Sequence, residues 1–170
     1  TSMVPNVVMI KGITGTNVVT LTPVCAKAYC DENNGTWDTS EDAKNNTDYG
    51  TSEGGCCINS DYGATWTKNE YGAECCKGSS NRWTDTNTSV CAKAYCIAQN
   101  KHWDTSNDAK AYNKSGTSDG ACCYGTWTGT ECCSISRTAY NAWTKEATTA
   151  CCARINKTLA YNSNGKPYCL

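Results

Sequence analysis

Hydrophobic positions are distributed unevenly along the chain, and the first 24 residues hold most of the aliphatic side chains. Nine of the 16 Val, Ile and Leu residues fall in this segment. Its β-branched run, broken by Gly12 and Gly15, predicts two short strands, about 6–13 and 17–22, joined as a hairpin and closed by Pro23. Because a lone hairpin is marginal in water, we expect it to cover the rest of the chain or to add a strand to a neighbouring subunit.

After residue 24 the pattern predicts short helices separated by turns. Residues 25–30 contain helix-forming Ala and Lys, and capping hydroxyls open the segments 39–44 and 105–110. A C-terminal helix is expected over 144–161, because apolar positions recur there every four residues at Ala147, Cys151, Ile155 and Leu159.

One stretch of this pattern occurs twice. Residues 24–30 return letter for letter as residues 90–96, and the offset of 66 holds through the cysteine doublets at 56–57 and 122–123. Over these 34 aligned positions 21 residues are identical, so the chain contains a duplicated unit.

Cysteine doublets and tryptophans alternate within the duplicated region. In an extended strand adjacent side chains point to opposite faces, so each doublet could bridge to one segment above and another below. The sequence alone leaves the connectivity open. Most of the tryptophans are expected to be buried against disulfides as core aromatics: Trp37, Trp66, Trp83, Trp103, Trp127 and Trp143.

Composition changes the expected source of stability. The chain has 15 Cys and no Phe in 170 residues, and after residue 24 it has few aliphatic side chains. Several disulfides, each contributing roughly 2–4 kcal/mol, can replace a missing hydrophobic core. Zinc binding is the alternative role for these cysteines. The chain has only one His, however, and adjacent cysteines in a doublet are poorly placed to ligate one tetrahedral ion. The disulfide candidates are Cys25, Cys30, Cys56, Cys57, Cys75, Cys76, Cys91, Cys96, Cys122, Cys123, Cys132, Cys133, Cys151 and Cys152.

These observations predict a small disulfide-rich α+β fold. Its parts are an N-terminal β segment (1–23), two tandem Cys/Trp repeat modules of short helices, short strands and long loops (24–89 and 90–150), and a C-terminal helix end and tail (151–170). An odd number of cysteines leaves one unpaired or intermolecular, and Cys169 in the tail is the expected spare.

Charge and redox chemistry narrow the functional class. A net charge of −1 argues against nucleic acid, and no apolar run is long enough for membrane insertion. Disulfides indicate an extracellular or cell-surface location, and a start at Thr1 fits a processed secreted product.

Candidate chemistry is sparse. The single His102 is expected to be exposed and inert. The recurring carboxylates Asp38/Asp104, Asp42/Asp108 and Glu53/Asp119 are interpreted mainly as caps and turn formers, with Ca²⁺ binding as the alternative. We therefore predict no catalytic residue, no metal and no cofactor.

The leading functional hypothesis is a non-catalytic structural protein that self-associates, as a subunit of a surface filament, pilus-like fibre or protective layer. The alternative is a secreted recognition or adhesion module that binds glycans or host proteins through loop Tyr and Trp residues.

Overall fold

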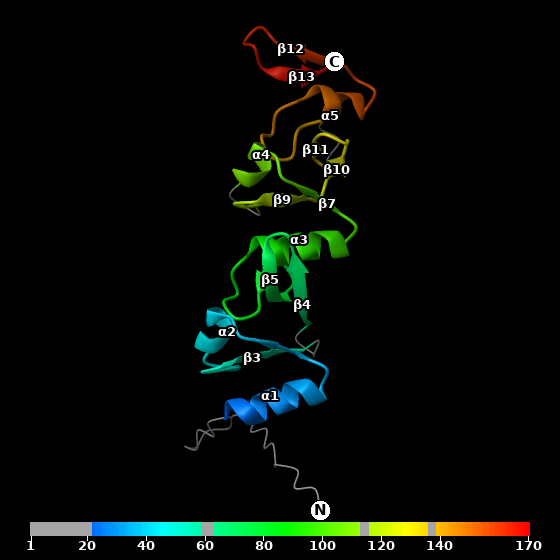
Figure 1. Cartoon of the computed structure of the whole chain (residues 1–170). Helices are drawn as coiled ribbons and strands as arrows, with labels where there is room; N and C mark the ends of the chain where they lie inside the picture. Colours follow the sequence, from blue (N-terminus) through cyan, green and yellow to red (C-terminus); the bar gives the residue numbers. More distant parts are fainter. Residues whose placement is uncertain (1–21, 59–62, 113–115, 136–138) are drawn as a thin grey trace, which may run out of the picture.

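The chain forms a small disulfide-rich α+β protein whose short helices and sheets are stacked along one axis (Figure 1). The computed structural model describes residues 22–58, 63–112, 116–135 and 139–170. The hairpin predicted for the N-terminal segment falls almost entirely on residues 1–21 and so lies outside the described residues.

The stack begins with a layer built from helices and a three-stranded sheet, which we call helix layer 1. It contains α1 (Pro23–Glu32), β1 (Thr36–Asp38), α2 (Glu41–Asn45), β2 (Gly50–Thr51) and β3 (Gly54–Cys57). The antiparallel strand order is β1-β3-β2, and α1 crosses one face of β3 (Figure 1).

The next layer is a meander of three antiparallel strands without a helix of its own, called hairpin layer 1. It consists of β4 (Ala64–Asn69), β5 (Gly72–Lys77) and β6 (Ser80–Asn81), in the order β4-β5-β6. The register places Thr65 opposite Cys76 and Trp66 opposite Cys75.

Helix layer 2 then repeats the arrangement of helix layer 1. Its elements are α3 (Ser89–Ala98), β7 (His102–Asp104), α4 (Asn107–Lys110), β8 (Gly116–Thr117) and β9 (Gly120–Cys123). The strand order β7-β9-β8 matches β1-β3-β2. The register matches as well, because a tryptophan lies opposite the first cysteine of the doublet in both sheets.

Two smaller layers complete the stack. Hairpin layer 2 is the pair β10 (Thr126–Trp127) and β11 (Cys132–Cys133). Helix layer 3 contains α5 (Thr149–Ala153) and the antiparallel pair β12 (Leu159–Tyr161) and β13 (Pro167–Cys169).

Local sequence explains where the helices begin and end. Ser40 and Ser106 cap α2 and α4 by accepting the backbone N–H of the residue three positions later. After α1, α3 and α5 the chain turns at an asparagine with positive φ: Asn34 (54°), Asn100 (56°) and Asn156 (58°). Asparagine tolerates this left-handed conformation better than most residues, so it ends each helix and starts the return into a strand.

The long C-terminal helix predicted over 144–161 is wrong. Only Thr149–Ala153 is helical, and β12 follows three residues after Asn156. Lys145, with φ of 62°, and a bridge between Tyr140 and Ala147 keep the preceding segment out of the helix. The four-residue spacing still marked the correct apolar residues, because Ala147, Cys151, Ile155 and Leu159 all pack in one cluster.

Cysteine makes up most of the core, as the shortage of aliphatic residues suggests. Nine cysteines have side chains that are fully buried, and Val90 is the one buried aliphatic residue larger than alanine among the described residues. The prediction that most tryptophans are core residues holds only for Trp83 and Trp103. The other four are half-buried.

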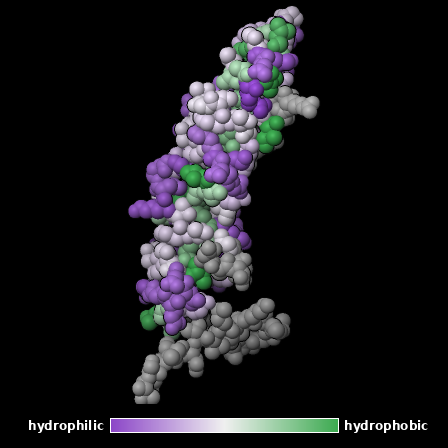
Figure 2. Space-filling model, turned by 90° about the vertical axis from the view of Figure 1, so that its right-hand side faces the viewer, coloured by the Kyte–Doolittle hydropathy of each residue, from purple (hydrophilic) through white to green (hydrophobic). Residues whose placement is uncertain are grey.

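The surface is mixed in polarity. On the face shown in Figure 2 small hydrophobic areas alternate with hydrophilic ones along the length of the molecule. In the described part of the chain, no helix has the length and hydrophobicity that crossing a bilayer requires.

Candidate functional site

The seven disulfides follow one another in single file, each starting on the element where the previous one ended, and this line of bonds is the most distinctive chemical feature of the molecule. The bonds connect α1 to β3, β3 to β5, β5 to α3, α3 to β9, β9 to β11, β11 to α5 and α5 to β13. The pairs are Cys30–Cys56, Cys57–Cys75, Cys76–Cys91, Cys96–Cys122, Cys123–Cys132, Cys133–Cys151 and Cys152–Cys169. Four of these bonds cross between layers, so each layer is covalently tied to the next.

The cysteine doublets make this possible in the way the sequence suggests. In β3, β5, β9 and β11 the two cysteines of each doublet bond to different elements, one earlier and one later in the chain. Opposite side-chain directions in a strand account for this division. The fifth doublet, Cys151-Cys152, lies in α5 rather than in a strand.

Cys169 is not the spare cysteine. It bonds to Cys152, and Cys25 is the free one; all 15 cysteines lie in the described residues. The prediction is wrong because a position in the C-terminal tail, outside the repeats, does not indicate which cysteine is unpaired. The duplication carried the better signal: Cys25 corresponds to Cys91, which bonds to the hairpin layer preceding its helix, and no such layer precedes α1 among the described residues.

A set of polar contacts surrounds the disulfide between hairpin layer 1 and α3. Thr88 is the N-cap of α3, and its Oγ1 accepts the backbone N–H of Cys91 at 3.4 Å. The same hydroxyl donates to Oε2 of Glu74 at 2.5 Å, and that oxygen lies 3.3 Å from the Cys91 sulfur. A carboxylate beside a helix N-terminus is electrostatically favourable, so Glu74 helps to seat α3 on β5.

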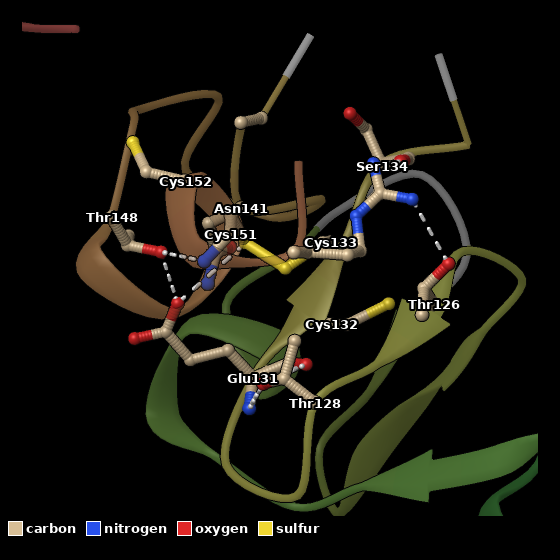
Figure 3. Close-up of a disulfide and its surroundings, with 12 residues drawn as sticks. Thr126, Thr128, Glu131, Cys132, Cys133, Ser134, Asn141, Thr148, Cys151 and Cys152 are labelled. Carbon is tan, nitrogen blue, oxygen red and sulfur yellow. Dashed lines mark hydrogen bonds between the residues drawn. A yellow bond between two sulfur atoms is a disulfide. The ribbon is translucent and has the colours of Figure 1, made fainter. Parts of the chain in front are cut away.

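The bond between hairpin layer 2 and α5 has the same surroundings (Figure 3). Thr148 caps α5 by accepting the N–H of Cys151 at 3.3 Å, and its hydroxyl donates to Glu131. We call each of these two disulfides, together with the polar residues around it, a joint. Both joints combine a helix that starts with Thr-x-x-Cys and a strand segment with the sequence Glu-Cys-Cys. The sequence carries a signal for both sites that the sequence analysis does not use: Glu74 and Glu131 each precede a doublet, and Thr88 and Thr148 stand three residues before cysteines.

Glu74, Cys76 and Cys91 lie close enough together to resemble a metal-binding group. Cys76 and Cys91 are bonded to each other, however, and metal ligation by cysteine requires a thiolate. With the disulfide formed, Glu74 is the one strong ligand left in this group, and the site is a structural joint.

Two of the recurring carboxylates also connect layers. Oδ1 of Asp38 accepts the N–H of Ser40, as expected for a turn, while Oδ2 accepts the indole N–H of Trp83 at 2.7 Å. Asp104 and Trp143 repeat this contact at 2.7 Å. The sequence analysis does not predict this long-range partner, because it treats the tryptophans as apolar core residues and not as hydrogen-bond donors.

The line of bonds has different residues at its two ends. Leu170 exchanges backbone hydrogen bonds with Thr158 and so occupies the sheet position that Cys57 and Cys123 hold in the other helix layers. A leucine at this position cannot continue the line of bonds. At the other end Cys25 is a cysteine with a free thiol.

The remaining predicted residues lie on the surface or at its edge. His102 is exposed and stacks on Trp127, with ring centroids 3.7 Å apart. Tyr112, Tyr124 and Trp143 line a shallow depression next to helix layer 2.

Protein-family models, curated proteins and solved structures give no match to this chain.

Proposed function

We propose that this chain is an extracellular, non-catalytic structural protein: a stiff, rod-like subunit of a surface filament, pilus-like fibre or protective layer. The observation that carries the proposal is the single file of disulfides, which ties every layer to the next along one axis. Such bonds persist in oxidising compartments, which supports an extracellular setting.

The contacts around the bonds support stiffness rather than mere cross-linking. A disulfide alone would leave adjacent layers free to rotate about it. The Trp83–Asp38 and Thr88–Glu74 hydrogen bonds add a second and a third point of attachment on either side of hairpin layer 1. Layers fixed at several points resist bending, which is what a spacer or filament subunit requires.

Small-angle X-ray scattering of the purified chain, before and after reduction, tests the rod. We expect a long, narrow particle in the oxidised form and an expanded, flexible one after reduction. A compact, near-spherical particle would remove the support for this function.

Light scattering coupled to size exclusion, with and without reductant, tests self-association. Oligomers or polymers are expected in the oxidised sample, and a strict monomer under both conditions would count against a filament subunit.

A second candidate function is glycan recognition, favoured by the depression lined by Tyr112, Tyr124 and Trp143. Aromatic rings with polar edges suit sugar ligands. Quenching or shifting of tryptophan fluorescence on addition of oligosaccharides, lost in Trp143→Phe with the fold retained, would support this role.

A further inference from the structure

The first turn of α1 has the same pattern of residues as the corresponding turn of α3, but among the described residues no layer packs on its outer face. Residues 22–25 and 88–91 share the pattern Thr-x-Val-Cys. In α3 this turn is buried against hairpin layer 1, and Val90 is 3% exposed. In α1 the side chain of Val24 is 76% exposed, and Cys25 is partly exposed with a free thiol.

The polar groups of the two helices differ in the same way. Thr88 caps its helix and binds Glu74, whereas Thr22, at the edge of the described residues, makes no side-chain capping hydrogen bond. Lys93 in α3 forms an ion pair with Glu70 of hairpin layer 1. Its counterpart Lys27 pairs within its own helix instead, with Asp31 at 2.9 Å.

We propose that the outer face of α1 binds a further hairpin layer that carries a Glu-Cys-Cys strand, and that the second cysteine of this strand forms a disulfide with Cys25. The two joints already present in the chain define the partner's chemistry. Its glutamate would accept a hydrogen bond from the Thr22 hydroxyl, and its apolar face would cover Val24. This inference extends the proposed function to a specific partner and rests on that function only for the extracellular setting.

The partner segment lies outside these 170 residues. Both Glu-Cys-Cys strands of the chain, residues 74–76 and 131–133, are already bonded to α3 and α5. Residues 1–21 contain no Cys, Asp or Glu and so cannot supply either group. A second copy in the same oxidised state has the same two strands occupied, which leaves a different polypeptide segment as the occupant.

The bond would form by thiol–disulfide exchange, with the partner cysteine initially held in a mixed disulfide with a small thiol. Cys25 loses its proton to solvent, and its thiolate attacks the partner sulfur. The new bond joins Cys25 to the partner, and the small thiol leaves with the electron pair of the broken bond. No external oxidant is consumed in this step.

A cyclic peptide of residues 64–77 provides the probe. These residues form β4 and β5, and Ala64 lies opposite Lys77, so a D-Pro-Gly turn can close the ring and hold the register. Cys75 is replaced by alanine, and Cys76 is activated as a mixed disulfide with 2-thiopyridine. Release of pyridine-2-thione on mixing with the full chain measures the rate of bond formation.

We expect the peptide to react with Cys25 at least about tenfold faster than its Glu74→Gln version, because the carboxylate–hydroxyl bond is charge-assisted. In the full chain, Cys25→Ser should abolish the reaction. Thr22→Val should slow the reaction of Cys25 with the peptide. It should not slow the reaction with 2,2′-dithiodipyridine, a small reagent whose rate reports only the accessibility of the thiol.

Three results would overturn the inference. Equal rates for the two peptides would show that the face does not select a Glu-Cys-Cys strand. Slow reaction with both the peptide and the small reagent would show that other residues of the chain cover Cys25. A Cys25-linked dimer forming faster than the peptide adduct would identify a second copy as the occupant.

The scattering experiment on the rod is independent of these outcomes. A compact particle that still forms the disulfide with the peptide would contradict the proposed function but support this inference. A rod-shaped particle that does not react with the peptide would support the proposed function and contradict this inference.

Discussion

The indole nitrogen of Trp83 donates a 2.7 Å hydrogen bond to Oδ2 of Asp38, which lies 45 residues earlier in the chain. Both side chains are buried, and the bond connects the loop after β6 to the sheet of helix layer 1. The same pair recurs as Trp143 and Asp104. Helix layers 1 and 2 are therefore each fixed to the following hairpin layer by a polar contact as well as by a disulfide.

Replacing Asp38 with alanine tests this contact. The change leaves the indole N–H of Trp83 buried without its acceptor, so we expect a loss of about 1–3 kcal/mol in the free energy of unfolding. Guanidinium denaturation of the oxidised protein measures it, and the exposed Asp48→Ala is the control. In a double-mutant cycle with Trp83→Phe the two losses should not add; full additivity would mean that the bond contributes little.

Burial separates two tryptophans at equivalent positions of the duplicated unit. Trp103 is 7% exposed, whereas Trp37 is half-buried. We expect Trp103→Ala to cost about 3–5 kcal/mol, as for other buried aromatic residues, and Trp37→Ala to cost clearly less. Thermal unfolding followed by circular dichroism gives both values. An equal or larger loss at Trp37 would contradict the difference in packing between the two helix layers.

The disulfides of hairpin layer 2 close loops of different length and so provide a test of how they stabilise the fold. Removing Cys133–Cys151 as a double alanine variant opens a separation of 18 residues, and removing Cys123–Cys132 opens 9. We expect a loss of about 3 kcal/mol for the longer loop. The shorter loop should cost about 0.6 kcal/mol less, because loop-closure entropy grows slowly with length.

Denaturant titration of the two variants, both checked for correct pairing of the remaining cysteines by peptide mapping, measures these losses. If the shorter loop proves the more costly to open, contacts in the folded state rather than chain entropy determine the contribution of these bonds.

Position 120 requires glycine, both because its backbone has a positive φ and because there is no room for a side chain. Its φ is 155°, and a Cβ atom there would lie 2.5 Å from the backbone oxygen of Asp104. Gly120→Ala should therefore destabilise the fold by about 1–3 kcal/mol. Gly165→Asn is the control, since φ there is 73° and the position is open. A loss at Gly120 no larger than at Gly165 would mean that β9 shifts to admit the methyl group.

Local features of the sequence predicted local structure well. The duplicated Ala- and Lys-containing segments do form helices, and the Ser40 and Ser106 caps begin short helices. The doublets bond in two directions, as strand geometry requires. These features depend on a few neighbouring residues, which is why they can be read without a structure.

Long-range features could not be predicted in the same way. The partner of Trp83 depends on how layers stack, and the pairing of Cys169 depends on how β13 folds back onto α5 within helix layer 3. Neither arrangement is encoded in a single segment. The four-residue spacing around Cys151 indicated a helix because both a helix and the observed turn-and-strand path bury the same residues. For Cys25 the signal was present, since its counterpart Cys91 follows a complete Glu-Cys-Cys strand, but its meaning depended on the connectivity.

The single-file arrangement of disulfides has a mechanical consequence. Tension applied along the axis passes through the sulfur–sulfur bonds, the backbone of the cysteine doublets and residues 91–96 of α3, so the oxidised molecule should lengthen very little. Reduction of a disulfide allows the loop that it closes to extend. The loop spans a sequence separation of 26 residues for Cys30–Cys56 and of 9 for Cys123–Cys132. At roughly 3.5 Å per residue the larger release approaches 90 Å. Reduction should thereby convert a nearly inextensible molecule into an extensible one.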